Sequence, residues 1–417
     1  MSFIRVSRHS VTTVVGLALA ISLSMPAAGR EIKAIQKDKR SGKIPVSDML
    51  RSGLVGDKKV FDEYYAIVLE LFQHPDNIRD LHKTRQDLAK DLSAAGNAPE
   101  KESHIRLREL LLAELPKIAE GKHDAPIRYN AMLLVAGLNL TEFQIGNKGI
   151  AIPLPEALPA LLAAFDDAKQ PDAVKVAAQI GILRHAQVEG GIAEKALATK
   201  VRESMLRLAA ADKTPAGRSE EGHAWLRRGA AEILGALGPA SDDADATRTV
   251  QALISLIDDT DASLGLRAEA ASALGKLKLS KKEKADLVAI AQSLGKLAVN
   301  VVEKESSRRA LKHYLLPVES ALRGPSAVAR PGEPAPTPTV GGIAALAADT
   351  PDKDFIEGLV AKFDTIMQVL NDDKLSDEDL AKKVVEEGQS LAKYLKLDSR
   401  RAAAADKAAE PARVVEK

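Results

Sequence analysis

Four stretches of this chain carry a basic residue and an alanine at fixed positions, and this recurrence constrains the fold more than any other feature. Counted from Leu111, Leu158, Ala210 and Val250, a Lys or Arg follows at an offset of 17 and an alanine at an offset of 20. The resulting pairs are Arg128/Ala131, Lys175/Ala178, Arg227/Ala230 and Arg267/Ala270. The starting points lie 47, 52 and 40 residues apart. Recurrence at such spacings predicts a stack of similar helical units.

The stretches that begin at Leu158 and Val250 match without a gap at an offset of 92. Each places apolar residues at positions 0, 3, 4 and 7, which form one face of a helix. An aspartate pair follows in both, Asp166/Asp167 and Asp258/Asp259, and indicates a turn before the second helix. Each unit is therefore predicted to be a helical hairpin.

Segments 225–238 and 266–277, with the turn at 256–261, resemble the second helices and inter-helix turns of HEAT repeats, especially the short bacterial kind. The resemblance covers residues 58–322 and is strongest over 158–278. It implies an all-α fold: a right-handed α-solenoid of about five to six hairpins. In HEAT repeats the basic residue commonly pairs with acidic groups in the turn. That implies Asp166/Asp167 as partners of Lys175 and Asp258/Asp259 as partners of Arg267.

The repeated residues have a structural interpretation and a functional one. A small alanine side chain lets neighbouring helices approach closely, so Ala131, Ala178, Ala230 and Ala270 are expected to be packing positions. The four bases, Arg128, Lys175, Arg227 and Arg267, are expected to hold the turns. The alternative is a ladder of cations that binds an anionic ligand.

Composition agrees with a helical protein and limits its partners. Hydrophobic residues make up 45% of the chain but aromatic residues only 3%, which suits helices packed through Ala, Leu, Val and Ile. Lys and Arg number 59 against 58 Asp and Glu, so no overall positive field favours nucleic acid. The scarcity of aromatic rings also argues against a surface that stacks bases.

The amino terminus resembles an export signal. Arg5 and Arg8 precede an uncharged apolar run at 11–25, and small residues follow Pro26. The run is short for a membrane span, which needs about 20 residues, although an uncleaved anchor is the alternative. We expect a periplasmic or secreted protein that keeps no stable transmembrane segment once the leader is removed. The chain has no cysteine, so it contains no disulfide and no thiolate metal site.

The domain organisation expected from these patterns has six parts. They are a signal peptide at 1–29, a flexible basic arm at 30–57, the repeat region at 58–323, a Pro/Ala-rich linker at 324–352, a helical hairpin at 353–398 and a disordered tail at 399–417. The carboxy-terminal hairpin is too small to bury much surface alone. We expect it to dock on the repeats, with pairing to another chain as the alternative.

No residue set in the chain has the spacing of a catalytic, cofactor or metal site. The eight histidines form no HExxH pattern, and His185 falls where other units carry leucine, so we interpret it as a packing residue. The segment 146–149 lacks the strand and the Lys-Ser/Thr ending of a phosphate-binding loop. We therefore expect no catalytic residue, no cofactor and no metal.

The sequence favours an exported, non-catalytic scaffold that binds an unidentified protein or peptide. One alternative is an enzyme accessory, since some HEAT-like proteins resemble phycobilin lyases. Another is a structural component of the cell envelope. The oligomeric state is left open.

Overall fold

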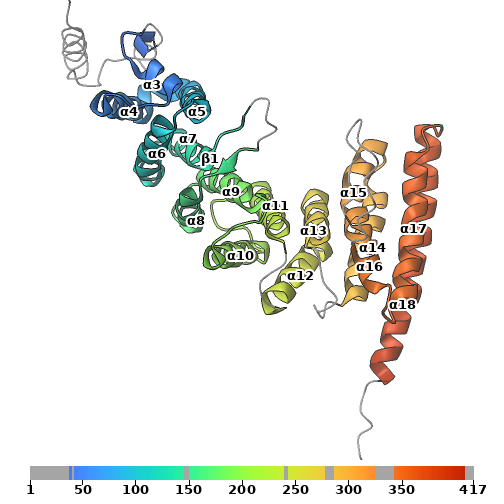
Figure 1. Cartoon of the computed structure of the whole chain (residues 1–417). Helices are drawn as coiled ribbons and strands as arrows, with labels where there is room; N and C mark the ends of the chain where they lie inside the picture. The colour runs from blue at the N-terminus through green and yellow to red at the C-terminus, as the bar shows by residue number, and fades with distance from the viewer. Residues whose placement is uncertain are drawn as a thin grey trace, which may run out of the picture. The chain divides into compact units, whose positions relative to one another are not determined.

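In the computed structural model the protein is all-α, with a single short pair of strands among the described residues (Figure 1). The structure describes residues 37–39, 42–144, 150–238, 243–277, 286–324 and 342–408. The expected signal peptide at 1–29 lies outside the described residues, as do 325–341 of the expected linker. The chain divides into two compact units, the first ending at Glu189 and the second beginning at Gly190.

The first unit contains seven α-helices among its described residues. They are α3 (Val46–Ser52), α4 (Lys58–Gln73), α5 (Leu81–Asn97), α6 (Glu102–Glu120), α7 (Ala125–Gly137), α8 (Leu158–Asp166) and α9 (Asp172–Ala186). Short 3-10 turns, Pro75–Asp80 and Pro155–Ala157, precede α5 and α8. Helices α6 and α7 form one hairpin and α8 and α9 another, while α5, α7 and α9 pack in a row beside α4, α6 and α8. The unit thus has two layers of helices.

The second unit repeats this arrangement. Its hairpins are α10 (Lys195–Ala209) with α11 (Glu220–Leu237), α12 (Asp243–Asp258) with α13 (Leu264–Lys276), and α14 (Leu287–Lys304) with α15 (Arg308–Arg323). Helices α11, α13 and α15 pack in one layer and α10, α12 and α14 in the other. The predicted hairpins that carry Arg227 and Arg267 are therefore present.

Small residues set the close approach of helices within each layer. A Cβ on Gly235 of α11 would lie 2.7 Å from Cα of Ala273 on α13, and one on Gly181 of α9 would lie 2.9 Å from Cβ of Ala136 on α7. Both distances are shorter than van der Waals contact, so only glycine fits. The four repeated alanines are fully buried, which is the burial that a packing role requires.

Helices α11, α13, α14 and α15 of the second unit begin at side chains that accept backbone hydrogen bonds. Ser219, Ser263, Asp286 and Ser307 each accept a bond from the N–H three residues later, at 2.9–3.3 Å. In the first unit Asp124 occupies the N-cap position expected for α7, with Pro126 in the first turn, but its side chain makes no capping bond. A residue can therefore occupy the N-cap position without its side chain accepting a hydrogen bond from the helix.

The expectation of a flexible arm over 30–57 is wrong for its second half. Helix α3 lies within it, and Ile44, Val46 and Leu50 are buried. Earlier in the same segment, Lys39 forms an ion pair with Asp91 of α5, whose other oxygen accepts a bond from the Tyr65 hydroxyl at 3.0 Å. Burial of apolar side chains and of this ion pair fixes the segment, although many of its residues are charged.

The carboxy-terminal boundaries also differ from those expected. Part of the expected linker forms helix α16 (Gly342–Ala347), because Ile343 and Ala347 are buried against α15 and α17. Helix α17 (Lys353–Asn371) and helix α18 (Asp377–Ala408) form the predicted hairpin, and α18 continues beyond 399, where we expected a disordered tail. The hairpin docks on α14 and α15, as predicted. Ser376 caps α18 by accepting from the N–H of Asp379 at 3.1 Å.

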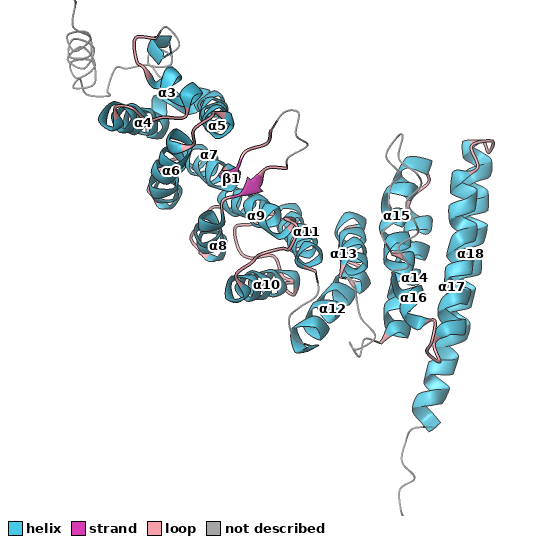
Figure 2. Ribbon diagram, viewed as in Figure 1, coloured by secondary structure: helices cyan, strands magenta, loops and turns pink. Residues whose placement is uncertain are grey.

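The strand pair was not predicted. Strand β1 (Asn139–Thr141) pairs in antiparallel fashion with β2 (Ile152–Pro153), where the sequence indicated only a loop between α7 and α8 (Figure 2). Residues 145–149, which include the glycine-containing turn considered as an anion site, lie outside the described residues.

Candidate interaction surfaces

Arg128, Arg227 and Arg267 each join their own hairpin to the following hairpin of the same unit. Arg128 donates from Nε to the carbonyl of Ala119, at the end of the first helix of its own hairpin, over 2.8 Å. Nη2 of Arg128 donates to Oε1 of Gln170, in the turn of the following hairpin, over 2.7 Å. Because the last carbonyls of a helix have no partner within that helix, a guanidinium is well suited to satisfy them.

The same arrangement recurs twice in the second unit. Arg267 donates to the carbonyl of Ile257 at 2.8 Å and to Oδ1 of Asn300 at 2.9 Å. Arg227 donates to the carbonyl of Ala209 at 3.3 Å and forms an ion pair with Asp259 at 3.4 Å. Both arginines are buried. Their donors are directed into the protein, which favours the structural interpretation over a ligand-binding ladder.

The partners implied for Arg267 are wrong in detail. Its hydrogen bonds go to a carbonyl and an amide, while Asp258 accepts from the Ser293 hydroxyl at 2.8 Å and Asp259 pairs with Arg227. Burial lowers the pKa of the Arg267 guanidinium, and the charges of the two aspartates oppose that shift. The carboxylates are thus neighbours of the guanidinium and not its hydrogen-bond partners. Lys175, at the same position on α9, is half-buried.

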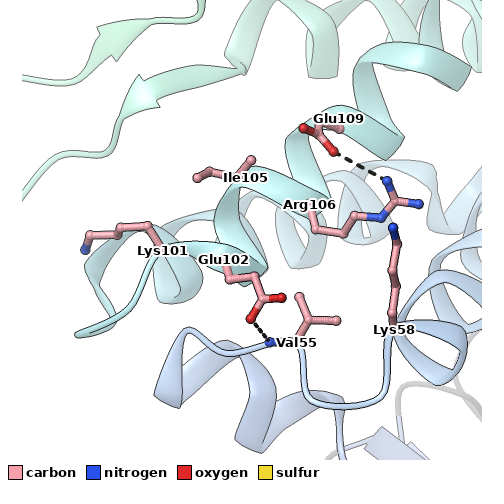
Figure 3. Close-up of a pocket in the computed structure, with 7 residues that line it drawn as sticks. All are labelled: Val55, Lys58, Lys101, Glu102, Ile105, Arg106 and Glu109. Atoms are coloured by element: carbon pink, nitrogen blue, oxygen red, sulfur yellow. Dashed lines mark hydrogen bonds and ion pairs between the residues drawn. The ribbon is translucent and has the colours of Figure 1, made fainter.

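An open pocket of about 450 Å³ lies in the first unit between the start of α6 and the segment before α4 (Figure 3). Glu102 accepts a bond from the N–H of Val55 at 3.1 Å, and Arg106 binds both oxygens of Asp62 at 2.7 and 2.8 Å. Lys58 extends toward the guanidinium of Arg106. The charged groups of Glu102 and Arg106 are therefore used within the protein, and the pocket offers mainly an apolar wall with an ammonium beside it.

The strand pair beside this region is anchored by buried polar groups. Glu142 lies 3.4 Å from Nε2 of His104 and accepts from the Asn139 amide at 2.9 Å. Arg184 of α9 donates to Oδ1 of Asn139 at 2.6 Å. Burial lowers the pKa of Arg184, and the charge of Glu142 opposes this shift. Residues from α6, the loop after β1 and α9 are thereby joined at one place.

Backbone contacts add to this anchor. Arg108 of α6 donates to the carbonyl of Leu140 at 3.2 Å, and Asn97 of α5 donates to the carbonyl of Phe143 at 3.2 Å. Gly96 permits the close approach, because a Cβ there would lie 2.3 Å from Cγ of Glu142. The base of the hairpin is therefore held against α5 and α6.

The anchored hairpin exposes large apolar side chains, which we call the apolar hairpin face. Exposed fractions are 42% for Leu140, 57% for Phe143, 83% for Ile150 and 41% for Ile152. These are four of the ten large apolar side chains that are exposed among the described residues. Exposed apolar side chains gathered on one element are typical of interaction sites, whereas scattered ones are not.

A second surface lies in the second unit, where the turns of hairpins α10–α11 and α12–α13 are adjacent. It is an open groove of about 1220 Å³, which we call the turn-side groove. Leu256, Leu266 and Ala209 are buried beneath it, and Trp225 lines the groove with 47% of its area exposed. His223 is engaged with the carbonyl of Ala211 at 2.7 Å.

His185 is buried at 7% exposure on α9, in agreement with its interpretation as a packing residue. Burial and the adjacent charge of Arg184 lower its pKa to about 4.

Across the part of the chain that the structure describes, no three His, Asp or Glu residues gather as a metal site would require. In the same residues, no helix has the length and apolar character needed to cross a bilayer.

Sequence reasoning missed both surfaces. The sequence did contain a pattern that indicates the strand pair. The Gly-Asn-Lys-Gly segment is flanked by apolar residues, as a hairpin turn is: Leu138, Leu140, Phe143, Ile150 and Ile152. The turn-side groove had none, because the positions that line it come from two hairpins and their adjacency is tertiary.

Comparison with known proteins does not assign the chain to a family. No protein-family model matches the chain, and no curated protein matches it. Nine chains of solved structures match. One is an engineered protein from the Northeast Structural Genomics Consortium, with 15% identity over 91% of this chain and 93% of that chain and a TM-score of 0.37. Similarity at that level carries no inference about function.

Proposed function

We propose that this protein is an exported, non-catalytic scaffold of HEAT-like helical hairpins that binds a protein or peptide partner. The apolar hairpin face is the observation that carries the proposal. Because three of the four side chains are already about half buried, covering each of them with a partner would contribute on the order of 1 kcal/mol before the cost of association. A surface of this kind is expensive to expose in a protein with no partner.

The anchor beneath the face supports a binding role. Bonds of Glu142, Asn139 and Arg184 fix the backbone of the segment that carries Leu140 and Phe143, so little backbone entropy is lost there when a partner binds. The bonds of the repeated arginines support the proposed scaffold role, because Arg128 reaches the turn of the following hairpin and Arg267 reaches the first helix of the following hairpin.

Export is proposed from the leader alone. Amino-terminal sequencing of the mature protein, together with cell fractionation, tests it. Recovery of a chain that begins near residue 30 in a soluble envelope fraction supports export, and an intact leader in the membrane fraction supports an anchored envelope component instead.

Partner binding is tested by capture from the native envelope fraction with wild-type protein and a Phe143→Ser/Ile152→Ser variant. Both positions are exposed, so the variant is expected to fold. The matched control is Leu316→Ser, at a residue that is 51% exposed in the second unit. The proposal expects one reproducible partner that the wild type and the control retain and the hairpin variant loses. Equal recovery by all three proteins contradicts a role for the face, and a bound pigment in the purified protein would favour the lyase-like alternative.

A further inference from the structure

We propose that the turn-side groove binds a cationic, partly apolar peptide segment, with an Arg or Lys side chain placed over the indole of Trp225. This site is on a different unit from the apolar hairpin face. The inference therefore stands or falls without the proposed hairpin partner.

The size of the groove favours a peptide over a small molecule. Its volume of about 1220 Å³ exceeds the roughly 300–1,000 Å³ that is usual for small-molecule pockets. It is lined by two turns and by the first residues of α11 and α13, with accessible apolar surface from Trp225 and from Ala210, Ala224 and Ala262. An extended segment could lie along this surface and bury alternate side chains.

The charges of the groove are unbalanced. Arg227 is paired with Asp259, and Arg228 is paired with Glu269 at 3.5 Å. The remaining charged lining residues are Asp212, Glu220, Glu221 and Asp261 against Lys213. None of these four carboxylates makes a side-chain ion pair with any residue that the structure describes. Over the whole lining, five carboxylates face three cations, so the groove keeps an excess of negative charge in a chain whose formal net charge is +1.

The exposed indole is an independent feature that selects the same ligand. Trp225 is the only tryptophan of the chain, and 47% of it is exposed although the side chain is large and apolar. The face of an indole attracts cations more strongly than the other aromatic rings do. Glu220 and Glu221 also stabilise the start of α11, where they occupy the first turn. That role does not account for an open groove with an exposed indole beside them.

Trp225 makes the test direct, because all tryptophan fluorescence comes from this residue. The probe is a short peptide that alternates Arg and Leu, titrated into the full-length protein at low and high salt. Two matched peptides replace each Arg with Glu or with Gln. The inference expects a saturable change in Trp225 fluorescence with the Arg peptide alone, weakened by salt because exposed charges are screened.

Charge-neutralising variants decide whether the groove is responsible. Glu220→Gln/Glu221→Gln is expected to weaken binding of the Arg peptide roughly threefold to tenfold, since each exposed charge pair contributes modestly. Glu303→Gln/Glu305→Gln makes the same charge change at the end of α14, outside the groove, and is expected to leave affinity unchanged. Circular dichroism spectra that match the wild type exclude unfolding as the cause in either variant.

Three results would overturn the inference. One is no fluorescence change with the Arg peptide. Another is an equal response to the Glu or Gln peptide, which would indicate a groove that selects apolar groups only. The third is a fluorescence change that depends on protein concentration and is not displaced by the Arg peptide, which would indicate that a second copy of the chain occupies the groove.

Discussion

Arg227 on α11 donates to Asp259, which lies in the turn of the next hairpin, over 3.4 Å, while the same guanidinium holds the last carbonyl of α10. The Arg227 side chain thus bonds to the first helix of its own hairpin and to the turn of the following hairpin. Arg128 and Arg267 do the same with neutral partners, Gln170 and Asn300. The acidic partner is therefore optional, and the contact with the carbonyl is the shared part.

Replacing Arg227 with methionine keeps an apolar stem and removes all of these bonds. The carbonyl of Ala209 and Oδ2 of Asp259 lose the guanidinium, while Oδ1 of Asp259 keeps its two backbone N–H donors, so we expect about 1–3 kcal/mol of destabilisation. Arg228→Met is the control, because its side chain is 48% exposed. The measurement is urea denaturation followed by circular dichroism. Equal midpoints for the two variants would remove the structural role assigned to Arg227.

Ala270→Asp tests the packing role of the repeated alanines. Ala270 is fully buried between helices, so an aspartate there is an unpaired buried charge and is expected to cost about 3 kcal/mol or more. Ala196→Asp, at an exposed position near the start of α10, is the matched control and is expected to be nearly neutral. An unchanged melting temperature for Ala270→Asp would contradict the packing assignment.

The buried ion pair between Lys39 and Asp91 accounts for the order of the segment that precedes α3. Their side chains are 13% and 12% exposed, and burial raises the pKa of Asp91 while Lys39 opposes that shift. Lys39→Met leaves a buried carboxylate with only Tyr65 as partner and is expected to cost about 3 kcal/mol. Lys43→Met is the control, because Lys43 is 73% exposed. Thermal unfolding that shifts equally in both variants would show that the pair contributes nothing specific.

The lowered pKa of His185 predicts that acid reduces the folding stability of the first unit. Its pKa falls from 6.5 to about 4 on burial, so the unfolded chain binds the proton more readily than the folded one. The contribution of His185 to stability is therefore present above pH 6.5 and is lost as the pH falls toward 4. We expect a loss of about 3 kcal/mol.

The check is to compare wild type with His185→Leu, since other units carry leucine at this position. The difference in unfolding free energy between the two proteins should grow as the pH is lowered from about 7 to about 4. Carboxylates that titrate in the same range cancel in this difference. A difference that does not vary with pH would show that His185 titrates normally in the folded protein.

The hairpins could be predicted because helical periodicity reports burial directly. The offsets from Ala210 and Val250 placed α11, α12 and α13, and the alanines at offset 20 coincide with fully buried positions. The start of α18 had an equally local signal, because Ser376 lies three residues before Asp379 and accepts a bond from its N–H. Signals of this kind depend only on residues close in sequence, which is why they can be recognised without a structure.

The partners of the arginines and the two surfaces could not be predicted in the same way. Periodicity does not say that Gln170 and Asn300 lie opposite Arg128 and Arg267, since each contact joins residues from different hairpins.

The segment before α4 was misjudged for a related reason, because its charge suggested a flexible arm. The burial of Ile44, Val46 and Leu50 depends on helices later in the chain, α4 to α6, being present to cover them. Composition alone does not report such contacts.

The central claim is that the apolar hairpin face binds a macromolecular partner, and site-specific photo-crosslinking tests it most directly. A photoreactive side chain is placed at Phe143 in one protein and at Glu120 in another, and both are irradiated in the native envelope fraction. Glu120 is exposed at the far end of α6, on the order of 18 Å along the helix axis from Arg108, which contacts the hairpin. The account predicts a discrete crosslinked species from position 143 that is absent from position 120. The same products from both positions, or none from position 143, would contradict it.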